Sequence, residues 1–525
     1  MVQQGTACRL PVHQSPYFGS STNKRIAKNT LLLYVRMLLT MAIGLYTSRV
    51  VLAELGISDY GLYSVVGGIV TMFTFINGSL NAGTQRFLTF ELGRGNIVQL
   101  KKIFSTAIVI YTFLALLILF LAETVGLWFL LNKMNFEPGR LNAAIWVYQF
   151  SIIACMVSII QVPFMAALVA HEKFDIYAYM SIYDAVMKLV IVFLLTFAPF
   201  DKLIFYASLI LLVNISSAII YNWYCRKHYD ECRFVWGLDK NVFKRMFSFS
   251  AWDVVGSLAS IGQLQGVNIV INMFCGTIVN AAYGIATTVN NIVMGFVNNF
   301  MMASNPQIVK TYAQNQLKEM FSLVINTAKM ASYLLLIIGI PVFIEVEFLL
   351  ELWLGEYPPY APLFLRIILI QSWVQTLGTP TIRALHATGN IKLMNILVGS
   401  LLLMILPVTY FLLRSGASPE IVLCVNIIPW VIAIPIRLVL LYRYCKFPIL
   451  SYIKKVILLG AAIAILCFFI PYITHTFFIN DAGWREFLAV GFVSFTTSVI
   501  IIFTIGIPKS IRLQIIGKMR EYFKF

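Results

Sequence analysis

Ionisable side chains inside long apolar segments are the residues of this chain whose types could do chemistry. A charge at the centre of a bilayer costs about 2.5–3.5 kcal/mol on insertion scales, so such a residue usually faces a polar cavity or a partner. Leaving out His, Cys and Tyr, seven basic and five acidic residues lie within such segments. They are Arg36, Arg49, Lys188, Lys329, Arg366, Arg383 and Arg437, and Glu123, Asp184, Asp253, Glu345 and Glu347.

The excess of basic over acidic residues favours an anionic substrate. Guanidinium groups present forked donors that suit phosphate oxygens. An exporter that exchanges protons for cationic compounds would want the opposite excess. We therefore predict that the seven basic residues line a cavity that binds an anionic substrate, and that Asp184, Asp253 and Glu123 are candidate coupling carboxylates.

Structural roles are the alternatives for these residues. Asp184 and Lys188 are four residues apart, so they share one helix face and can pair with each other. The acidic residues can also be boundary residues or members of other ion pairs. Four basic side chains are placed so that they can reach the inner headgroups instead: Arg36, Lys329, Arg383 and Arg437.

Amide side chains are dense in the apolar segments 249–275 and 277–303. Amides hydrogen-bond sugar hydroxyls, and they also join membrane helices to one another. We predict that Asn268, Asn290 and Asn291 contact the substrate. The full set is Gln263, Gln265, Asn268, Asn272, Asn280, Asn290, Asn291, Asn298 and Asn299.

Membrane helices must position these residues. The chain is 60% hydrophobic and 12% charged, against about 45–50% and about 25% in soluble proteins. A membrane-spanning helix needs about 20 mostly apolar residues. Fourteen runs meet this: 29–53, 61–83, 103–131, 142–168, 176–198, 203–224, 249–275, 277–303, 323–349, 361–385, 393–413, 421–442, 456–474 and 487–507. The runs 393–413 and 421–442 are interrupted by Pro407, Pro429 and Pro435.

The distribution of Lys and Arg predicts the orientation. With a cytoplasmic N-terminus, the inner segments carry 27 basic residues and the outer segments carry 5. This bias places both termini in the cytoplasm and explains the net charge of +17 without a nucleic-acid partner. The loops are too short for a nucleotide-binding or catalytic domain, and no phosphate-loop motif is present. We therefore expect no enzyme activity and no cofactor. We also expect no resident metal, because the loop residues Cys225, His228 and Cys232 lack a fourth ligand.

The chain also repeats itself. Six spans separate the copies, so the two halves keep the same orientation and enclose a substrate cavity. The matching pairs are Tyr60-Gly61-Leu62 with Tyr283-Gly284-Ile285, Gln85 with Gln307, and Leu100–Phe104 with Leu317–Phe321. The predicted parts are a cytoplasmic tail (1–28), an N-lobe (29–224), a cytoplasmic inter-lobe loop (225–248), a C-lobe (249–442), spans 13 and 14 (443–507) and a basic cytoplasmic tail (508–525).

Three segments carry local motifs: SRVVLAELGISDYGLY at 48–63, ELGRGN at 91–96 and SNPQ at 304–307. They resemble segments of the bacterial polysaccharide flippases of the multidrug/oligosaccharidyl-lipid/polysaccharide exporter superfamily. The span pattern fits that family along nearly the whole chain, from residue 24 on. Fourteen spans fit its polysaccharide and lipid II branches, whereas the drug-exporting branch usually has twelve.

The resemblance implies an all-α, V-shaped fold with two lobes and alternating access. It implies an O-antigen-type flippase that moves undecaprenyl-diphosphate-linked oligosaccharide across the bacterial cytoplasmic membrane. Expected partners are membrane lipid, a proton or sodium counter-ion, and polysaccharide polymerase or assembly proteins. The alternatives are a drug or metabolite exporter of the same fold, a lipid II flippase and, from another class, a membrane-embedded polymerase or ligase.

Overall fold

The chain is helical throughout the part that can be described. The computed structural model describes residues 28–44, 46–47, 50–51, 54–55, 81–133, 140–198, 200–235, 239–478, 483–507 and 512. Within these ranges there is no strand, and eleven helical stretches are long and apolar enough to cross a membrane. The predicted all-α, multi-span class is therefore confirmed.

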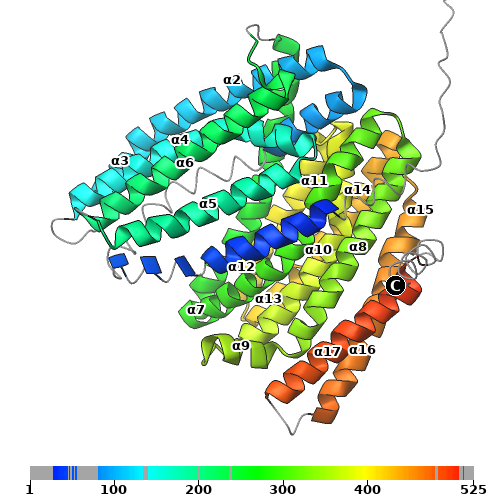
Figure 1. The fold of residues 1–525 in the computed structure, drawn as a ribbon. Helices are drawn as coiled ribbons and strands as arrows, with labels where there is room; N and C mark the ends of the chain where they lie inside the picture. Colours follow the sequence, from blue (N-terminus) through cyan, green and yellow to red (C-terminus); the bar gives the residue numbers. More distant parts are fainter. Residues whose placement is uncertain are drawn as a thin grey trace, which may run out of the picture.

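The N-lobe is a bundle of helices on one side of the molecule (Figure 1). Asn96 caps the first of them through its side chain, and Asp201 caps the last in the same way. The helices are α2 (Ile97–Leu121), continued by a π-helical turn (Ala122–Gly126) into α3 (Leu127–Lys133), then α4 (Leu141–Ala170), α5 (Phe174–Leu195) and α6 (Lys202–His228).

The C-lobe is built around α7 (Lys240–Ala313), which packs against α8 (Leu317–Ile344) and α10 (Ala361–Thr388). A straight helix as long as α7 would span about 110 Å at 1.5 Å per residue. Phe249 and Ile308, near its two ends, nevertheless belong to one packed cluster. The segment α7 therefore folds back on itself and supplies two arms, as the predicted spans 249–275 and 277–303 require.

Two membrane crossings of the C-lobe are broken helices. The first consists of α11 (Lys392–Leu403) and α12 (Ile405–Arg414), and the second of α13 (Pro419–Val425) and α14 (Ile428–Cys445). Proline has no backbone N–H for the carbonyl four residues earlier. Pro407 therefore explains the break after Leu403, and Pro429 the break after Val425.

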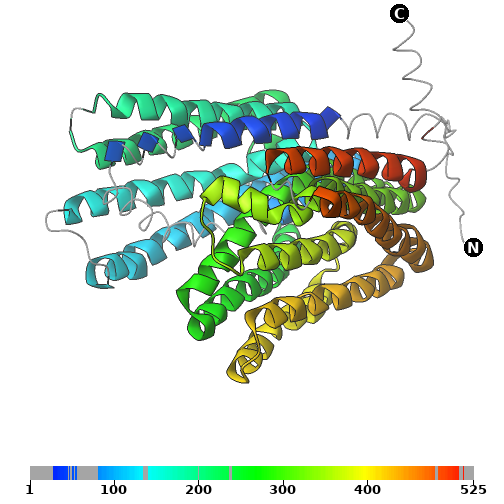
Figure 2. The same cartoon turned by 90° about the horizontal axis from the view of Figure 1, so that it is seen from below.

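A C-terminal hairpin lies along α8 at the edge of the C-lobe, as Figure 2 shows from below. Tyr333 and Ile340 of α8 share an apolar cluster with Ile463 and Val490 of the hairpin. Its elements are α15 (Ile449–Tyr452), a π-helical turn (Ile453–Leu458), α16 (Leu459–Phe478), α17 (Trp484–Ile501) and a second π-helical turn (Ile502–Gly506).

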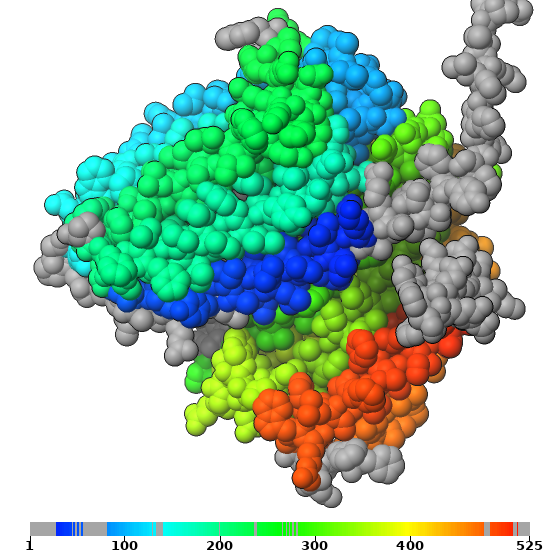
Figure 3. All heavy atoms as spheres, in the orientation of Figure 1, coloured from blue at the N-terminus to red at the C-terminus, as the bar shows by residue number. Residues whose placement is uncertain are grey.

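Twelve of the fourteen predicted spans have a helical counterpart in the described residues, eleven as separate candidate crossings and one as the second arm of α7. The spans 29–53 and 61–83 lie partly or largely outside the described residues, as do the tails 1–28 and 508–525. The count of fourteen and the division into parts therefore stay predictions. The helical residues 28–44, dark blue in Figure 3, lie along the junction of the two lobes.

The lobes meet through contacts that the internal repeat relates to one another. The rings of Phe90 and Tyr312 lie 6.4 Å apart, and these residues have the same sequence offset as Gln85 and Gln307. A residue that contacts its own repeat equivalent lies beside the rotation axis, because the rotation exchanges the two. The contact between Phe90 and Tyr312 is therefore expected for a parallel duplication. The test of the duplication is whether the two halves superpose by rotation about the membrane normal.

Two reciprocal hydrogen-bonded contacts, which we call the clasps, lie beside that axis. In one, Gln307 of the C-lobe donates to Glu172 of the N-lobe at 2.6 Å. In the other, Arg86 of the N-lobe donates to the carbonyls of His386 and Ala387, at 3.0 and 3.2 Å. All these residues lie at helix ends that the distribution of basic residues places on the cytoplasmic side, so the lobes are joined at that side.

Reporter fusions test this orientation. Fusions at Asp239 and after Phe525 are expected to report a cytoplasmic position, because the distribution of Lys and Arg places both sites on the inner side of the membrane. A fusion at Gly355, directly after α9 (Val346–Leu354), is expected to report a periplasmic position. Paired phosphatase and fluorescent-protein reporters measure this, and inverted readings would contradict the orientation and the assignment of the clasps to the cytoplasmic side.

Candidate substrate cavity

A cavity of 840 Å³ lies between both arms of α7 and helices α10, α11 and α14 of the C-lobe, and Ala82 of the N-lobe also lines it. We call it the C-lobe cavity. These helices run back and forth through the lobe, so they bring together side chains that are far apart in the sequence. Its polar lining combines amides, hydroxyls and charged groups: Asp253, Ser257, Ser260, Gln263, Asn268, Tyr283, Thr287, Asn290, Asn291, Asn298, Gln371, Ser372, Gln375, Thr379, Arg383, His386, Asn395 and Arg437.

Two arginines give the cavity a positive side. Arg437 is only 3% exposed, and its guanidinium lies 5.9 Å from the ring centre of Trp430. Gly378 makes room for it, since a Cβ there would come within 3.0 Å of Nη1 of Arg437. Arg383 lies one helical turn beyond Gly378 on α10 and lines the same cavity. The cavity can therefore offer forked donors to an anion.

One carboxylate accompanies these arginines. Oδ1 of Asp253 lies 3.3 Å from Nε2 of His386, and both side chains are buried. Arg383 lies near enough to Asp253 for the two charges to interact. The negative charge of Asp253 is thus partly offset by its neighbours His386 and Arg383. The charge of Arg437 then leaves the cavity wall with a net positive charge.

The amides of the cavity are ordered by a few contacts. Oδ1 of Asn290 accepts a hydrogen bond from Ser372 at 2.8 Å, and Asn395 donates to the carbonyl of Trp252 at 2.6 Å. Oδ1 of Asn268 and Nε of Arg437 are buried and have no hydrogen-bond partner in the described part of the chain. Buried polar atoms without partners are costly, and a polar ligand with both donors and acceptors would satisfy them.

Six of the residues predicted as site residues meet in this cavity. They are Asp253, Asn268, Asn290, Asn291, Arg383 and Arg437. Arg49 lies outside the described residues, and nothing can be said of the side chains of Gln265, Asn272 and Asn280.

Arg36 belongs to a separate contact between the lobes. Its Nη2 donates to Oδ1 of Asn299 at 3.0 Å, and its guanidinium lies 4.9 Å from the ring centre of Tyr177 on α5. The first helical segment is thereby joined to both α5 and the second arm of α7. Arg36 does not line the C-lobe cavity.

Asp184 and Lys188, both among the described residues, form no direct ion pair. Asp184 accepts a hydrogen bond from Ser217 on α6, while Lys188 is exposed and only its charge acts on Asp184. The closely packed α5–α6 contact explains this, because Ser217 approaches Asp184 from the neighbouring helix. Lys188 does not line the C-lobe cavity either.

Three other predicted residues make structural contacts outside the cavity, two of them to carbonyls at helix ends. Nζ of Lys329 donates to the carbonyl of Gly506 at 2.8 Å. Arg366 bonds the carbonyl of Phe343 and pairs with Glu347 at 2.7 Å, so it caps the end of α8. Glu123 accepts from Gln149 at 3.2 Å in the π-helical turn after α2. Unpaired carbonyls at helix ends attract cations, which explains why basic residues inside spans need not face a cavity.

The structure also adds residues that the sequence did not predict. His386 and Trp430 line the cavity, as do Ser372, Gln371 and Gln375 of α10. The signal that could have found the α10 residues is the spacing of Gln371, Gln375 and Thr379 at four residues, which places them on one helix face.

The known proteins that resemble this chain are found through their structures. No protein-family model and no curated protein matches this chain. Among solved structures, an outward-facing multidrug resistance MATE family transporter of the MOP superfamily superposes with a TM-score of 0.68 and 11% identity, over 80% of this chain and 95% of that chain. The MATE transporter VcmN of Vibrio cholerae, in a mutant form, gives a TM-score of 0.69 and 15% identity, over 82% and 99%.

The chain has the MATE transporter fold. A third structure, from Pyrococcus furiosus, has a TM-score of 0.65 and 12% identity over 82% of this chain and 96% of that one. It is described as a MOP superfamily transporter whose binding pocket has reversed polarity, suggesting a different function. The resemblance seen in the sequence is thus supported at the level of the superfamily fold, while these similarities do not select the polysaccharide branch.

Proposed function

We propose that this chain is a membrane transporter that moves undecaprenyl-diphosphate-linked oligosaccharide from the inner to the outer leaflet of the bacterial cytoplasmic membrane. The exported glycan would serve surface polysaccharide synthesis. The observation that carries this proposal is the C-lobe cavity, in which Arg383 and Arg437 accompany a wall of amides and hydroxyls. The arginines suit a diphosphate, and the amides suit sugar hydroxyls.

Alternating access is the mechanism that the arrangement supports. The clasps join the lobes at the predicted cytoplasmic side, so this conformation is closed toward the cytoplasm. Export would require the clasps to open, the cavity to load its substrate, and the clasps to form again. The substrate's lipid chain would stay in the bilayer while its polar part crosses through the cavity, since sugar and phosphate are costly to place in hydrocarbon.

A drug or metabolite exporter of the same fold is the second candidate. The similarity to multidrug resistance transporters favours it. A cationic drug would be attracted by Asp253, the one carboxylate among the described residues that line the cavity, but this carboxylate already faces His386 and Arg383. The positive character of the wall therefore favours the anionic substrate, and a lipid II flippase would share this preference.

A deletion strain separates these functions. If the chain exports lipid-linked oligosaccharide, its loss is expected to cause that intermediate to accumulate on the inner face, while surface polysaccharide disappears. Complementation with the wild-type chain should reverse both effects. Increased sensitivity to cationic drugs with normal surface polysaccharide would instead support the exporter, and loss of peptidoglycan synthesis would support the lipid II flippase.

A further inference from the structure

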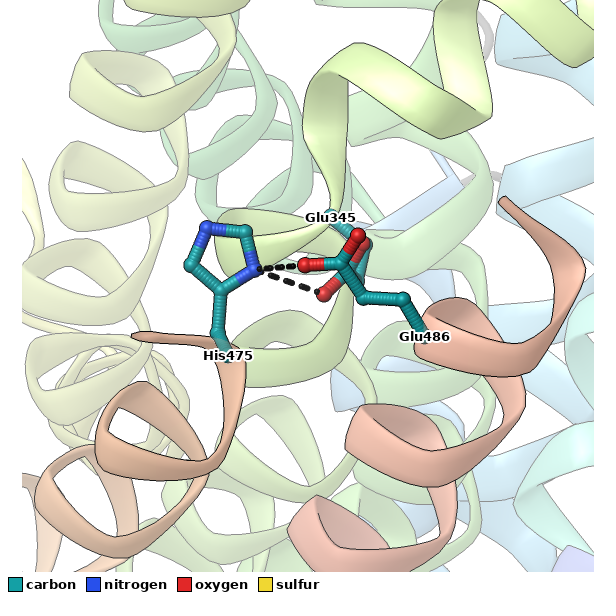
Figure 4. Close-up of side chains that lie close together, drawn as sticks. All are labelled: Glu345, His475 and Glu486. Atoms are coloured by element: carbon teal, nitrogen blue, oxygen red, sulfur yellow. Dashed lines mark hydrogen bonds and ion pairs between the residues drawn. The ribbon is translucent and has the colours of Figure 1, made fainter. Parts of the chain in front are cut away.

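Three side chains converge at the end of the C-terminal hairpin, away from the cavity. Nδ1 of His475, on α16, lies 3.1 Å from Oε1 of Glu345 and 2.9 Å from Oε1 of Glu486 (Figure 4). Glu345 stands between α8 and α9, and Glu486 lies in the first turn of α17. One nitrogen and two oxygens from three separate elements thus surround a common point.

Two of the three side chains are buried carboxylates. The side chain of Glu345 is 4% exposed and that of Glu486 is 8% exposed. When both carboxylates are ionised, the single imidazole can match at most one of their charges. The next strong charged neighbour of Glu345 is Glu347, a further carboxylate, which is paired with Arg366. Buried charges without partners are costly, so a cation is favoured here.

The hydrogen bonds within the group are also incomplete. The ring of His475 is placed to hydrogen-bond Glu345 through Nδ1. Oε1 of Glu486 is buried and accepts no hydrogen bond from any described residue, although it lies only 2.9 Å from the same nitrogen. A single N–H at Nδ1 cannot donate well to both carboxylate oxygens, whereas a metal ion can bind Nδ1 and the two oxygens as ligands.

The two separations between Nδ1 of His475 and the carboxylate oxygens match metal coordination. In octahedral geometry with bonds of about 2.1 Å, neighbouring ligand atoms lie about 3.0 Å apart. The second nitrogen of His475 points away from both carboxylates in Figure 4, which leaves Nδ1 free to act as the ligand. Mg²⁺ and Ca²⁺ prefer oxygen ligands alone, whereas imidazole with carboxylates suits Zn²⁺ or Mn²⁺.

We propose that Glu345, His475 and Glu486 bind one divalent first-row transition-metal ion. The ion would fasten α16 and α17 to the start of α9, at the end of the hairpin that the orientation places on the periplasmic side. The proposal does not depend on which substrate the chain transports.

Direct binding of Mn²⁺ to the purified full-length chain tests this proposal. The affinity tag is removed and the protein is stripped with a chelator, and bound Mn²⁺ is then counted by electron paramagnetic resonance. Mn²⁺ is the probe because thiols prefer softer ions, so the free cysteines do not interfere. We expect saturable binding of one Mn²⁺ per chain, displacement by Zn²⁺, and a higher thermal midpoint when the ion is present.

Variants locate the ion. His475→Gln and Glu486→Gln are each expected to weaken Mn²⁺ binding by at least about a hundredfold, since changes outside the ligand shell already cost 10–100-fold. Glu351→Gln is the matched control, because it removes an exposed carboxylate of α9 that lies outside the group. Absence of stoichiometric Mn²⁺ and Zn²⁺ binding by the wild-type chain overturns the proposal without any variant, as does unchanged binding by folded His475→Gln.

Discussion

Replacing Arg437 by Gln is expected to slow export of lipid-linked oligosaccharide by about tenfold to a hundredfold. The change removes a charge-assisted hydrogen bond to the diphosphate, which is worth about 1.5–3 kcal/mol. Arg383→Gln is expected to have a similar effect, and the double variant should show no measurable export. The measurement is the amount of surface polysaccharide divided by the amount of folded transporter in the membrane, in the deletion strain.

Lys329→Gln is the matched control for this prediction. It also neutralises a buried basic residue of the membrane region, but that residue bonds Gly506 at the hairpin and lies outside the cavity. We expect lower thermal stability and an unchanged export rate per folded molecule. Full export by Arg437→Gln and Arg383→Gln at normal expression would show that the two arginines do not bind the substrate.

Arg86→Ala is expected to shift the transporter toward a state that is open to the cytoplasm. Arg86 makes two hydrogen bonds to the end of α10 on the other lobe. Their loss is worth about 1.5–3 kcal/mol, so the ratio of closed to open molecules should fall by tenfold or more. Spin labels at Lys227 and Lys318, both exposed and on different lobes, are expected to move apart in a background without reactive cysteines.

Two further variants make this prediction specific. Gly389→Ala should act in the same direction, because a Cβ at residue 389 would lie 2.6 Å from Nη2 of Arg86 and the backbone there is left-handed. Arg94→Ala should leave the label distance unchanged, since Arg94 stacks on Phe90 of its own lobe and, among the described residues, donates no hydrogen bond to the C-lobe. An unchanged distance in Arg86→Ala would mean that this clasp does not hold the lobes together.

Most of the fold could be predicted from the sequence, because long apolar runs and the positions of Lys and Arg report directly on membrane crossings. Two of the three prolines also indicated the interrupted crossings. Pro407 and Pro429 lie just after the observed breaks, whereas Pro435 lies inside α14, which continues through it. The extent of α7 was less predictable, since hydropathy shows two apolar runs without showing how far helical backbone continues between and beyond them.

The site was predicted only in part, because polarity within a span does not reveal the direction in which a side chain points. Arg437 and Lys329 look alike in the sequence, yet one lines the cavity and the other bonds Gly506. Contacts between helices decide such cases. Ser217 and Asp184 come together only when α5 packs on α6, and His386 reaches Asp253 only when α10 packs on α7.

Reconstitution of the purified chain into proteoliposomes tests the central claim most directly. The vesicles carry a labelled undecaprenyl-diphosphate-linked oligosaccharide, and a lectin or glycosidase added outside reports the fraction that reaches the outer leaflet. We predict that the wild-type chain raises this fraction above that of protein-free vesicles, and that the Arg383→Gln/Arg437→Gln double variant does not. Transport of a cationic dye with no translocation of the lipid-linked oligosaccharide would contradict the account.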